Sequence, residues 1–485
     1  MYLSLLFVGA VFCTGQELLN QTTKLRVLLL ISYSEIVNET MLTVEMAEER
    51  VRSEGIAPDW LHFDVVGIRS CSGYREKQSF EPVNDAAGYY FGSGIDAIIG
   101  PECSPGMRQL AQLVRLWNIP VLAYRAIDSS LNDKEKYPTL CRVSVTMDSL
   151  SEATISLLRH FNWHQVGLVS DPDDHYGLWL YRAIKRSLLQ TEIRINADVG
   201  IRRKLVEMDG PPAFKTLREQ ARIIILTMSF SAYSSREFLA SLVKFNMTQP
   251  DFKYIVLTTS GGFYQVETMT EDEKRGYSHS LVVSAEGEDS KTERRFMKRM
   301  EEEKNADFSW QPNYRNRKKY PVYHDTVYFY MSVAGELAAN NQTHILRDGH
   351  QFWSRLTQRN FQGASGHVFI DAKAERKPSY IVETVVNGKQ THIMRLNVQA
   401  SCINTCTTRL GQTIGNVSYS WQEQEQEQEQ EQEHEHEHEH EHEHEHEHEH
   451  EHEHEHEHEH EHEHEHEHEH EHEHEHEQEQ EQEQE

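Results

Sequence analysis

The first 421 residues lack the sequence signatures of the common catalytic sites. They contain no GxxxxGK[ST] phosphate loop, no GxSxG nucleophile turn and no HExxH metal-binding helix. Each signature places a reactive group in a defined local geometry, so their absence removes the usual sequence argument for an enzyme. We therefore expect no catalytic residue and no metal site in this part of the chain.

Long apolar runs and an excess of one charge are also absent before residue 422. No stretch after Gly15 reaches 18 consecutive apolar residues, so no membrane-spanning helix is predicted. Of the 79 acidic residues, 32 glutamates lie between Glu423 and Glu485, and the remaining 47 nearly balance the 48 lysines and arginines. This balance gives no reason to expect attraction to nucleic acid or to anionic lipid.

The acidic excess belongs to a low-complexity tail. From Gln422 to Glu485 the residues alternate strictly as Gln-Glu, Glu-His and again Glu-Gln, with 22 histidines between His434 and His476. Repulsion among the glutamates predicts a disordered segment. Imidazole and carboxylate groups suit zinc, copper or nickel, so a metal-binding tail is one interpretation. The other, which we favour on composition alone, is a translated repeat without function or a misread gene model.

The amino terminus has the pattern of an export signal. Residues 1–15 (MYLSLLFVGAVFCTG) contain an apolar core followed by small residues, and the segment is too short to span a bilayer. Five glycosylation sequons occur in the chain, at Asn20, Asn38, Asn246, Asn341 and Asn416. We expect an extracellular glycoprotein, either secreted or held at the outer face of the plasma membrane.

Strand and helix patterns alternate along the body. KLRVLLLISY (24–33) and DAIIGP (96–101) are typical of buried parallel strands, and 40–55 and 104–118 have helical spacing. The alternation repeats after residue 149, and late hairpin strands are predicted at 366–372, 379–388 and 391–397. About 420 residues exceed one compact core. The prediction is an α/β fold with two doubly wound parallel-sheet lobes and an interlobe cleft.

Three segments resemble the ligand-binding ectodomains of receptor guanylate cyclases and natriuretic peptide receptors. They are DAIIGPECSPGMRQLAQLVRLWNIPVLAY (96–124), PTLCRVSVTMDSLSEATISLLRHFNWHQVGLVSDPDDHYG (138–177) and NFQGASGHVFIDAKAERKPSYIV (360–382). The resemblance covers about 24–400 and implies the fold of type I periplasmic binding proteins. The chain would cross between lobes near 145, 287 and 365. Lobe 1 would then hold 24–145 and 288–364, and lobe 2 would hold 146–287 and 365–400.

The resemblance also implies roles for the cysteines. The Cys of the GPxC turn pairs in the family with one on the preceding strand, which corresponds here to Cys103 and Cys71. Cys402 and Cys406 would close a small loop in a juxtamembrane-like segment at 401–421. Cys141 has no evident partner and is interpreted as a buried thiol.

In natriuretic peptide receptors the GPxC turn also holds a chloride ion. The resemblance would make Gly100, Cys103 and the hydroxyl of Ser70 or Ser72 its contacts. A turn at the start of a helix favours an anion, and a disulfide-locked turn without an ion is the alternative. Apart from this ion, no cofactor is expected.

The ligand is the open question. Relatives that bind amino acids use a Ser-Thr-Ser cluster where this chain has Ala126, Ile127 and Asp128, so amino-acid binding is disfavoured. The resemblance implies a homodimer that binds a peptide hormone or a small extracellular ligand. Candidate cleft residues follow a strand of lobe 2, although such loops are more often only solvated. They are Asp173, Asp174, His175 and Tyr176.

Two functions follow from the resemblance. The chain is the ligand-binding domain of a receptor guanylate cyclase-like protein whose signalling parts lie elsewhere. Alternatively, it is a complete secreted decoy or clearance-type binding protein, with or without a metal-binding tail.

Overall fold

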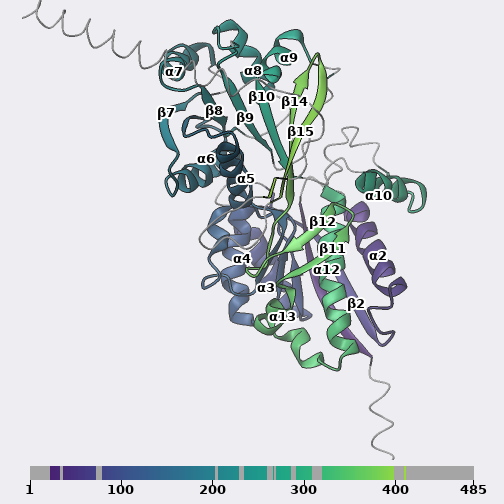
Figure 1. Ribbon diagram of the computed structural model, residues 1–485. Helices are drawn as coiled ribbons and strands as arrows, with labels where there is room; N and C mark the ends of the chain where they lie inside the picture. Colours follow the sequence, from purple (N-terminus) through teal and green to yellow (C-terminus); the bar gives the residue numbers. More distant parts are fainter. Residues whose placement is uncertain are drawn as a thin grey trace, which may run out of the picture. The chain divides into compact units, whose positions relative to one another are not determined.

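The computed structural model describes residues 22–32, 37–72, 79–202, 206–228, 234–248, 250–258, 266, 269–285, 291–307, 319–397 and 409–410. Within these residues the chain forms two sheets of eight strands each, with helices alternating with the strands (Figure 1). This confirms the predicted α/β fold with two doubly wound sheets. The export signal, the outer sequons Asn20 and Asn416, the pair Cys402 and Cys406, and the tail lie outside the described residues.

The first sheet has the order β11-β12-β13-β5-β4-β3-β1-β2. Its strands are β1 (Thr23–Ser32), β2 (Leu61–Ser70), β3 (Ala97–Ile99), β4 (Val121–Ala123), β5 (Leu140–Val145), β11 (Arg359–Gly363), β12 (Gly366–Ile370) and β13 (Glu375–Arg376). The strands from β1 to β5 are parallel, and β13 adds to β5 in parallel. The antiparallel pairs β13–β12 and β12–β11 extend this edge.

Helices cover both faces of the first sheet, and its central strand β1 is therefore buried on both sides. Leu25, Val27, Leu29 and Ile31 pack with α2 (Val37–Ser53), α12 (Lys319–Ala339) and α13 (Gly349–Leu356). Leu28 and Leu30 pack on the other side with α3 (Glu81–Gly92) and α4 (Ser104–Trp117). This alternation is the two-residue period of a strand, and it explains the continuous apolar run. Short 3-10 helices, η3 (Ser129–Asn132) and η6 (Thr343–Arg347), lie in connections.

The second sheet repeats this plan with the order β16-β15-β14-β10-β9-β8-β6-β7. Its strands are β6 (Gln165–Ser170), β7 (Arg194–Gly200), β8 (Ile223–Leu226), β9 (Lys253–Thr258), β10 (Ser280–Ala285), β14 (Ser379–Val386), β15 (Lys389–Asn397) and β16 (Arg409–Leu410). The first five are parallel, and β14 to β16 form an antiparallel edge. Its helices are α5 (Met147–His160), α6 (His175–Leu188), α7 (Val206–Gln220), α8 (Ser234–Lys244) and α9 (Glu271–Ser278).

The predicted position of the third crossing is wrong by about a dozen residues. Residues 366–372 were expected to enter the second lobe, but β12 pairs with β11 and β13 pairs with β5, so all three belong to the first sheet. The chain therefore leaves this sheet after Arg376. The strands that precede the other two predicted crossings, β5 and β10, end at Val145 and Ala285. Helix α10 (Lys291–Glu302), which follows β10, packs against α2 and α12 in the first lobe.

No helix in the described part of the chain is long and apolar enough to cross a bilayer. Four described helices, α3, α7, α9 and α13, were not predicted, and the first two contain residues with low helix propensity. α3 contains Pro82, Gly88 and Gly92, and α7 contains Pro211 and Pro212. Tertiary packing overrides this low helix propensity, because each helix buries an apolar stripe against its sheet.

Candidate functional site

Each of the two sheets has a point at which the strand order reverses, and this point is where a ligand site is expected. In the first sheet β1 lies between β2 and β3, and in the second β6 lies between β7 and β8. In the first sheet β2 is added on one side of β1, and the chain then crosses back to add β3, β4 and β5 on the other side. In doubly wound sheets ligands bind outside the carboxyl ends of the strands at such a switch point. The candidate site therefore consists of residues that directly follow these strands.

Glu102 follows β3 at the first switch point, and its carboxylate is buried among polar partners. The residue is 8 % exposed. Its Oε1 lies 3.4 Å from Nε of Arg125, which follows β4, and 3.5 Å from Nζ of Lys319, the first residue of α12. Ser32, the last residue of β1, hydrogen-bonds the same carboxylate. These four residues, the Glu102 cluster, join the ends of three neighbouring strands to α12.

The charge on Glu102 is stabilised by its surroundings. Burial disfavours the ionised form and acts to raise the pKa of this carboxyl group. The charges of Arg125 and Lys319 and the hydrogen bond from Ser32 outweigh burial, so the pKa lies below its ordinary value. The Glu102 carboxylate is therefore ionised at neutral pH and lies between two cations, in a place shielded from water.

Two buried tyrosines lie beneath the cluster. The hydroxyl of Tyr124 donates to the carbonyl oxygen of Leu30 at 2.9 Å, and its ring lies 4.1 Å from the ring of Tyr323. The Tyr323 hydroxyl accepts the N–H of Ser32 at 3.3 Å. Gly100 passes so close that a Cβ atom would lie 2.5 Å from the Leu30 oxygen, and its φ of +93° also favours glycine. These contacts fix the turn that carries Glu102.

The loop after β4 is organised by a fully buried arginine. Nη1 of Arg142, on β5, donates to the carbonyl oxygens of Ala126 at 3.3 Å and Asp128 at 2.8 Å. Nε of Arg142 pairs with the Glu375 carboxylate at 2.5 Å. The Asp128 carboxylate accepts from Arg108 and caps η3. The segment that carries hydroxyl groups in amino-acid-binding relatives is thus built here from apolar residues and an ion pair.

The predicted cleft residues follow β6 at the second switch point, where they start a helix. Asp174 is the N-cap of α6, and its Oδ1 accepts the N–H of Tyr176 at 3.1 Å. Asp173 is exposed and Tyr176 is half-buried, while the side chain of His175 lies outside the described residues. The buried member of this loop is Asp171, whose Oδ1 accepts the N–H of Asp173 at 3.0 Å. Asp174 therefore has the contacts of a helix cap.

The GPxC turn carries the disulfide that the family resemblance implied. Cys71, at the end of β2, is joined to Cys103, at the start of α4, with their Cα atoms 6.1 Å apart. Cys141 on β5 is a buried free thiol, and burial raises its pKa above the ordinary value. This agrees with the interpretation of Cys141 as an inert core residue.

The resemblance implied a chloride ion at this turn, held by Gly100, Cys103 and Ser70 or Ser72. The N–H of Gly100 donates to a carbonyl oxygen of β4 at 2.8 Å. Both the N–H and the hydroxyl of Ser72 donate to the Glu81 carboxylate. Ser70 is buried beside Asp85, whose pKa is raised by burial. Two predicted donors, Gly100 and Ser72, are thus already used, whereas the buried Ser70 hydroxyl has no hydrogen-bond partner of normal geometry among the described residues, so the chloride ion stays a prediction.

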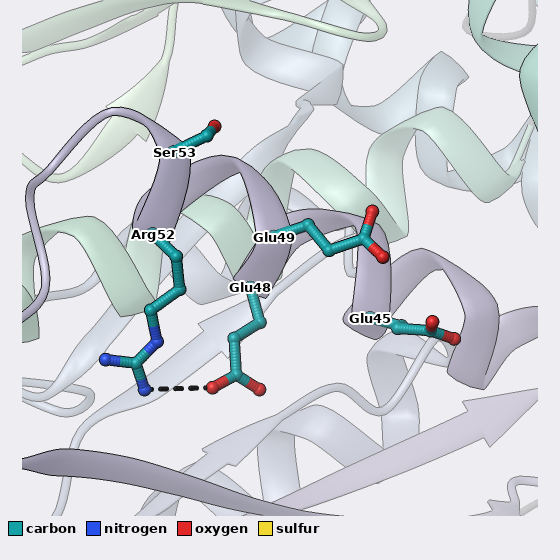
Figure 2. A pocket seen from close by; sticks show the side chains of 5 residues that line it. All are labelled: Glu45, Glu48, Glu49, Arg52 and Ser53. Carbon is teal, nitrogen blue, oxygen red and sulfur yellow. Dashed lines mark hydrogen bonds and ion pairs between the residues drawn. The ribbon is translucent and has the colours of Figure 1, made fainter. Parts of the chain in front are cut away.

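A shallow hollow lies along α2. It is lined by Glu45, Glu48, Glu49, Arg52 and Ser53 (Figure 2). Glu48 faces Arg52 at 3.0 Å, and Lys304 pairs with both Glu45 and Glu49. The acidic groups have cationic partners from the same chain, as on an ordinary solvated surface. Across the described residues, no group of three or more His, Cys, Asp or Glu side chains could hold a metal ion.

Comparison with known proteins now decides the family. A family model described as the receptor family ligand binding region matches residues 39–388. The chain belongs to this family. The matched range of this receptor ligand-binding region includes Glu102, Arg125 and Lys319 and begins after Ser32.

The similar proteins include receptors of two kinds. Receptor-type guanylate cyclase gcy-8 of Caenorhabditis elegans is 24 % identical over 392 residues, which cover 75 % of this chain and 32 % of the relative. For gcy-23 of the same organism the identity is 23 % over 410 residues, covering 78 % and 36 %. Taste receptor type 1 member 2 of Canis lupus familiaris is 35 % identical over 99 residues, covering 20 % and 12 %. The receptor ligand-binding region thus spans about a third of the cyclases.

The Glu102 cluster was not predicted from the sequence. The prediction singled out the glycine and the cysteine of the GPxC turn, but not the glutamate between them. A usable signal was present, because an acidic residue in a turn between a buried strand and a helix requires partners when it is buried. The partners themselves, Arg125 and Lys319, come from distant parts of the chain and carry no local signature.

Proposed function

We propose that this receptor ligand-binding region is the extracellular part of a receptor guanylate cyclase-like protein and binds a peptide hormone or a small extracellular ligand. The observation that carries the proposal is the similarity to two receptor-type guanylate cyclases along three quarters of the chain. A ligand-binding region is not itself catalytic. Cyclase activity is therefore proposed for a whole protein that contains this region.

A chimeric receptor tests this function. Residues 1–421 would be joined to the membrane helix and intracellular parts of a known receptor guanylate cyclase, and cyclic GMP would be measured in cells exposed to libraries of secreted peptides and small molecules. We expect one ligand class to change cyclic GMP, and a chimera with an unrelated ectodomain not to respond. A ligand that binds the purified region but never changes cyclase activity would contradict the proposal and favour the secreted decoy.

The secreted decoy or clearance-type protein remains the second candidate. The observation that favours it is the Glu-His repeat after Trp421, whose side chains suit transition metals. Sequencing the transcript beyond the Trp421 codon separates the two functions. An apolar segment of about 20 residues followed by intracellular modules supports the receptor, and a stop after the repeat supports the decoy.

We also propose that the region forms a homodimer through an apolar surface on α3 and α4. Phe91 is 78 % exposed and Leu116 is 73 % exposed. The Tyr90 ring stacks on Trp117 at 4.1 Å, and Phe91 meets the same indole edge-on at 6.0 Å. These four residues form the α3–α4 face. The outward positions of α3 beside Phe91 are asparagine and glycine, so the α3 side of this face carries no charge, and the exposed Arg115 of α4 directly precedes Leu116.

Charges placed on the α3–α4 face test the dimer. The double variant Phe91→Asp, Leu116→Asp is expected to sediment at half the mass of the wild type. The free energy needed to bury two carboxylates per copy exceeds the free energy gained from the apolar contact. Leu189→Asp is the matched control, since Leu189 is 71 % exposed just after α6, outside the face. A double variant that still sediments as a dimer would rule this interface out.

Glycan sites are a further proposal for an extracellular chain. Asn38, Asn246 and Asn341 are exposed, and the last two have positive φ directly after helical segments. Loss of a mobility shift after amidase treatment of each Asn→Gln variant would identify the sites that carry glycan.

A further inference from the structure

The first switch point contains a carboxylate that the chain itself supplies. Ser32 ends β1, Glu102 follows β3 and Arg125 follows β4, and these three strands are neighbours in the sheet. The cations of Arg125 and Lys319 approach the same oxygen, Oε1 of Glu102, at 3.4 and 3.5 Å. Two positive groups and one hydroxyl therefore converge on one buried anion. Such a set of donors is what a protein uses to bind the carboxylate of a ligand.

We propose that Glu102 is a built-in anion that fills the ligand position of the first switch point and excludes anionic ligands from it. This inference rests on one part of the proposed function, namely that the region binds a ligand. The occupation of the position by Glu102 is a property of the fold, whichever ligand binds.

Charge and packing both support this exclusion. The Glu102 carboxylate already uses the donors of Ser32, Arg125 and Lys319, so a ligand carboxylate would have to displace it to reach them. The adjacent loop replaces hydroxyl donors with Ala126 and Ile127, and its Asp128 carboxylate is already paired with Arg108, so these three side chains offer no donor to an anion. A ligand group that binds at this edge is therefore one that needs no buried cation, such as an amide or a hydroxyl.

Removing the built-in anion should create an anion site. Glu102→Ala leaves a space lined by Ser32, Arg125 and Lys319 that matches a small carboxylate. We expect the full chain carrying Glu102→Ala to unfold at a lower temperature than the wild type. Sodium formate at about ten times its dissociation constant should then raise the unfolding temperature of the variant by roughly 2–4 °C, with saturation. Sodium chloride at equal ionic strength should raise it less, and wild-type protein should show no saturable response to formate.

Two variants make the test specific. Lys319→Met in the Glu102→Ala background is expected to weaken formate binding at least tenfold, because one of the two cations is lost. Glu102→Ser also leaves most of this space. If Glu102→Ala does not fold, the same measurement is made on Glu102→Ser. A formate response that is equal in wild type and variant, or absent from both small-residue variants, would overturn the inference. Neither readout involves a hormone or a cyclase, so failure here leaves the proposed function standing.

Discussion

Replacing Cys71 and Cys103 together by alanine is expected to lower the free energy of unfolding of the first lobe by about 3–4 kcal/mol. The disulfide joins residues 32 positions apart, and a cross-link of this length restricts the unfolded chain strongly. It also joins the end of β2 to the start of α4, beside the turn that carries Glu102. Denaturant unfolding, followed by circular dichroism, measures the change.

The matched control for this pair is Cys141→Ala. Cys141 is as buried as the paired cysteines but forms no disulfide. Removing its sulfur leaves a small cavity and is expected to cost about 1 kcal/mol. Equal losses for the pair and for the control would mean that packing of sulfur, rather than the cross-link, stabilises this lobe.

Replacing Asp325 by asparagine is expected to destabilise the first lobe by about 3–5 kcal/mol. The Asp325 carboxylate on α12 has no exposed surface. It accepts the N–H of Ala364 at 2.6 Å and both the N–H and the hydroxyl of Ser365 at 2.8 and 2.6 Å. It also pairs with Nδ1 of His324 at 2.9 Å. An asparagine keeps the volume, but it removes the charge and turns an amide donor toward these donors.

The loss should concentrate in the turn between β11 and β12. Hydrogen exchange measured by mass spectrometry is expected to show faster exchange in peptides that contain Ala364 and Ser365. Asp64→Asn is the control, because Asp64 forms an exposed pair with Lys24 at 2.8 Å, and pairs of this kind contribute at most about 1 kcal/mol. If Asp64→Asn cost as much as Asp325→Asn, the assignment of a structural role to the buried carboxylate would fail.

The same carboxylate predicts how stability depends on acid. Burial acts to raise the pKa of Asp325, and the hydrogen bond from His324 leads the interactions that bring it below its ordinary value. A folded-state pKa below the unfolded one means that the unfolded chain takes up the proton first. The stabilisation is therefore fully present above about pH 4 and is lost as the pH falls through the folded-state pKa. Asp325→Asn should flatten this acid limb in pH-dependent denaturation.

The sequence predicts the larger elements well because their signals are local. The apolar run of β1 is buried on both faces, and the Ser-Pro start of α4 places Pro105 in the first turn of that helix. The residues of α3 and α7 favour turns, and only contact with a completed sheet makes them helical. The same holds for β13, which is two residues long and pairs with a strand more than 200 positions earlier.

Site residues were predicted where a sequence motif carries them, and they were missed where their partners lie far away along the chain. The Cys71–Cys103 pair was predicted because a known motif carries it. The acidic loop after β6 was predicted from its place after a strand, yet a sequence cannot show that Asp174 is used as a helix cap. Glu102 became recognisable only when folding brought Arg125 and Lys319 to it, from positions that no local pattern connects.

The two residues of β13 have a mechanical consequence. Glu375 pairs with Arg142, and Arg376 donates to the carbonyl oxygen of Val143, so β13 is clamped to β5 by buried side chains. The strands are parallel, and both lead out of the first lobe at the same edge of the sheet. Beyond that edge, Lys377 pairs with Glu152 on α5 at 2.7 Å. The two outgoing strands are therefore tied to each other where they leave the sheet, and sliding of one past the other requires breaking the buried Glu375–Arg142 ion pair.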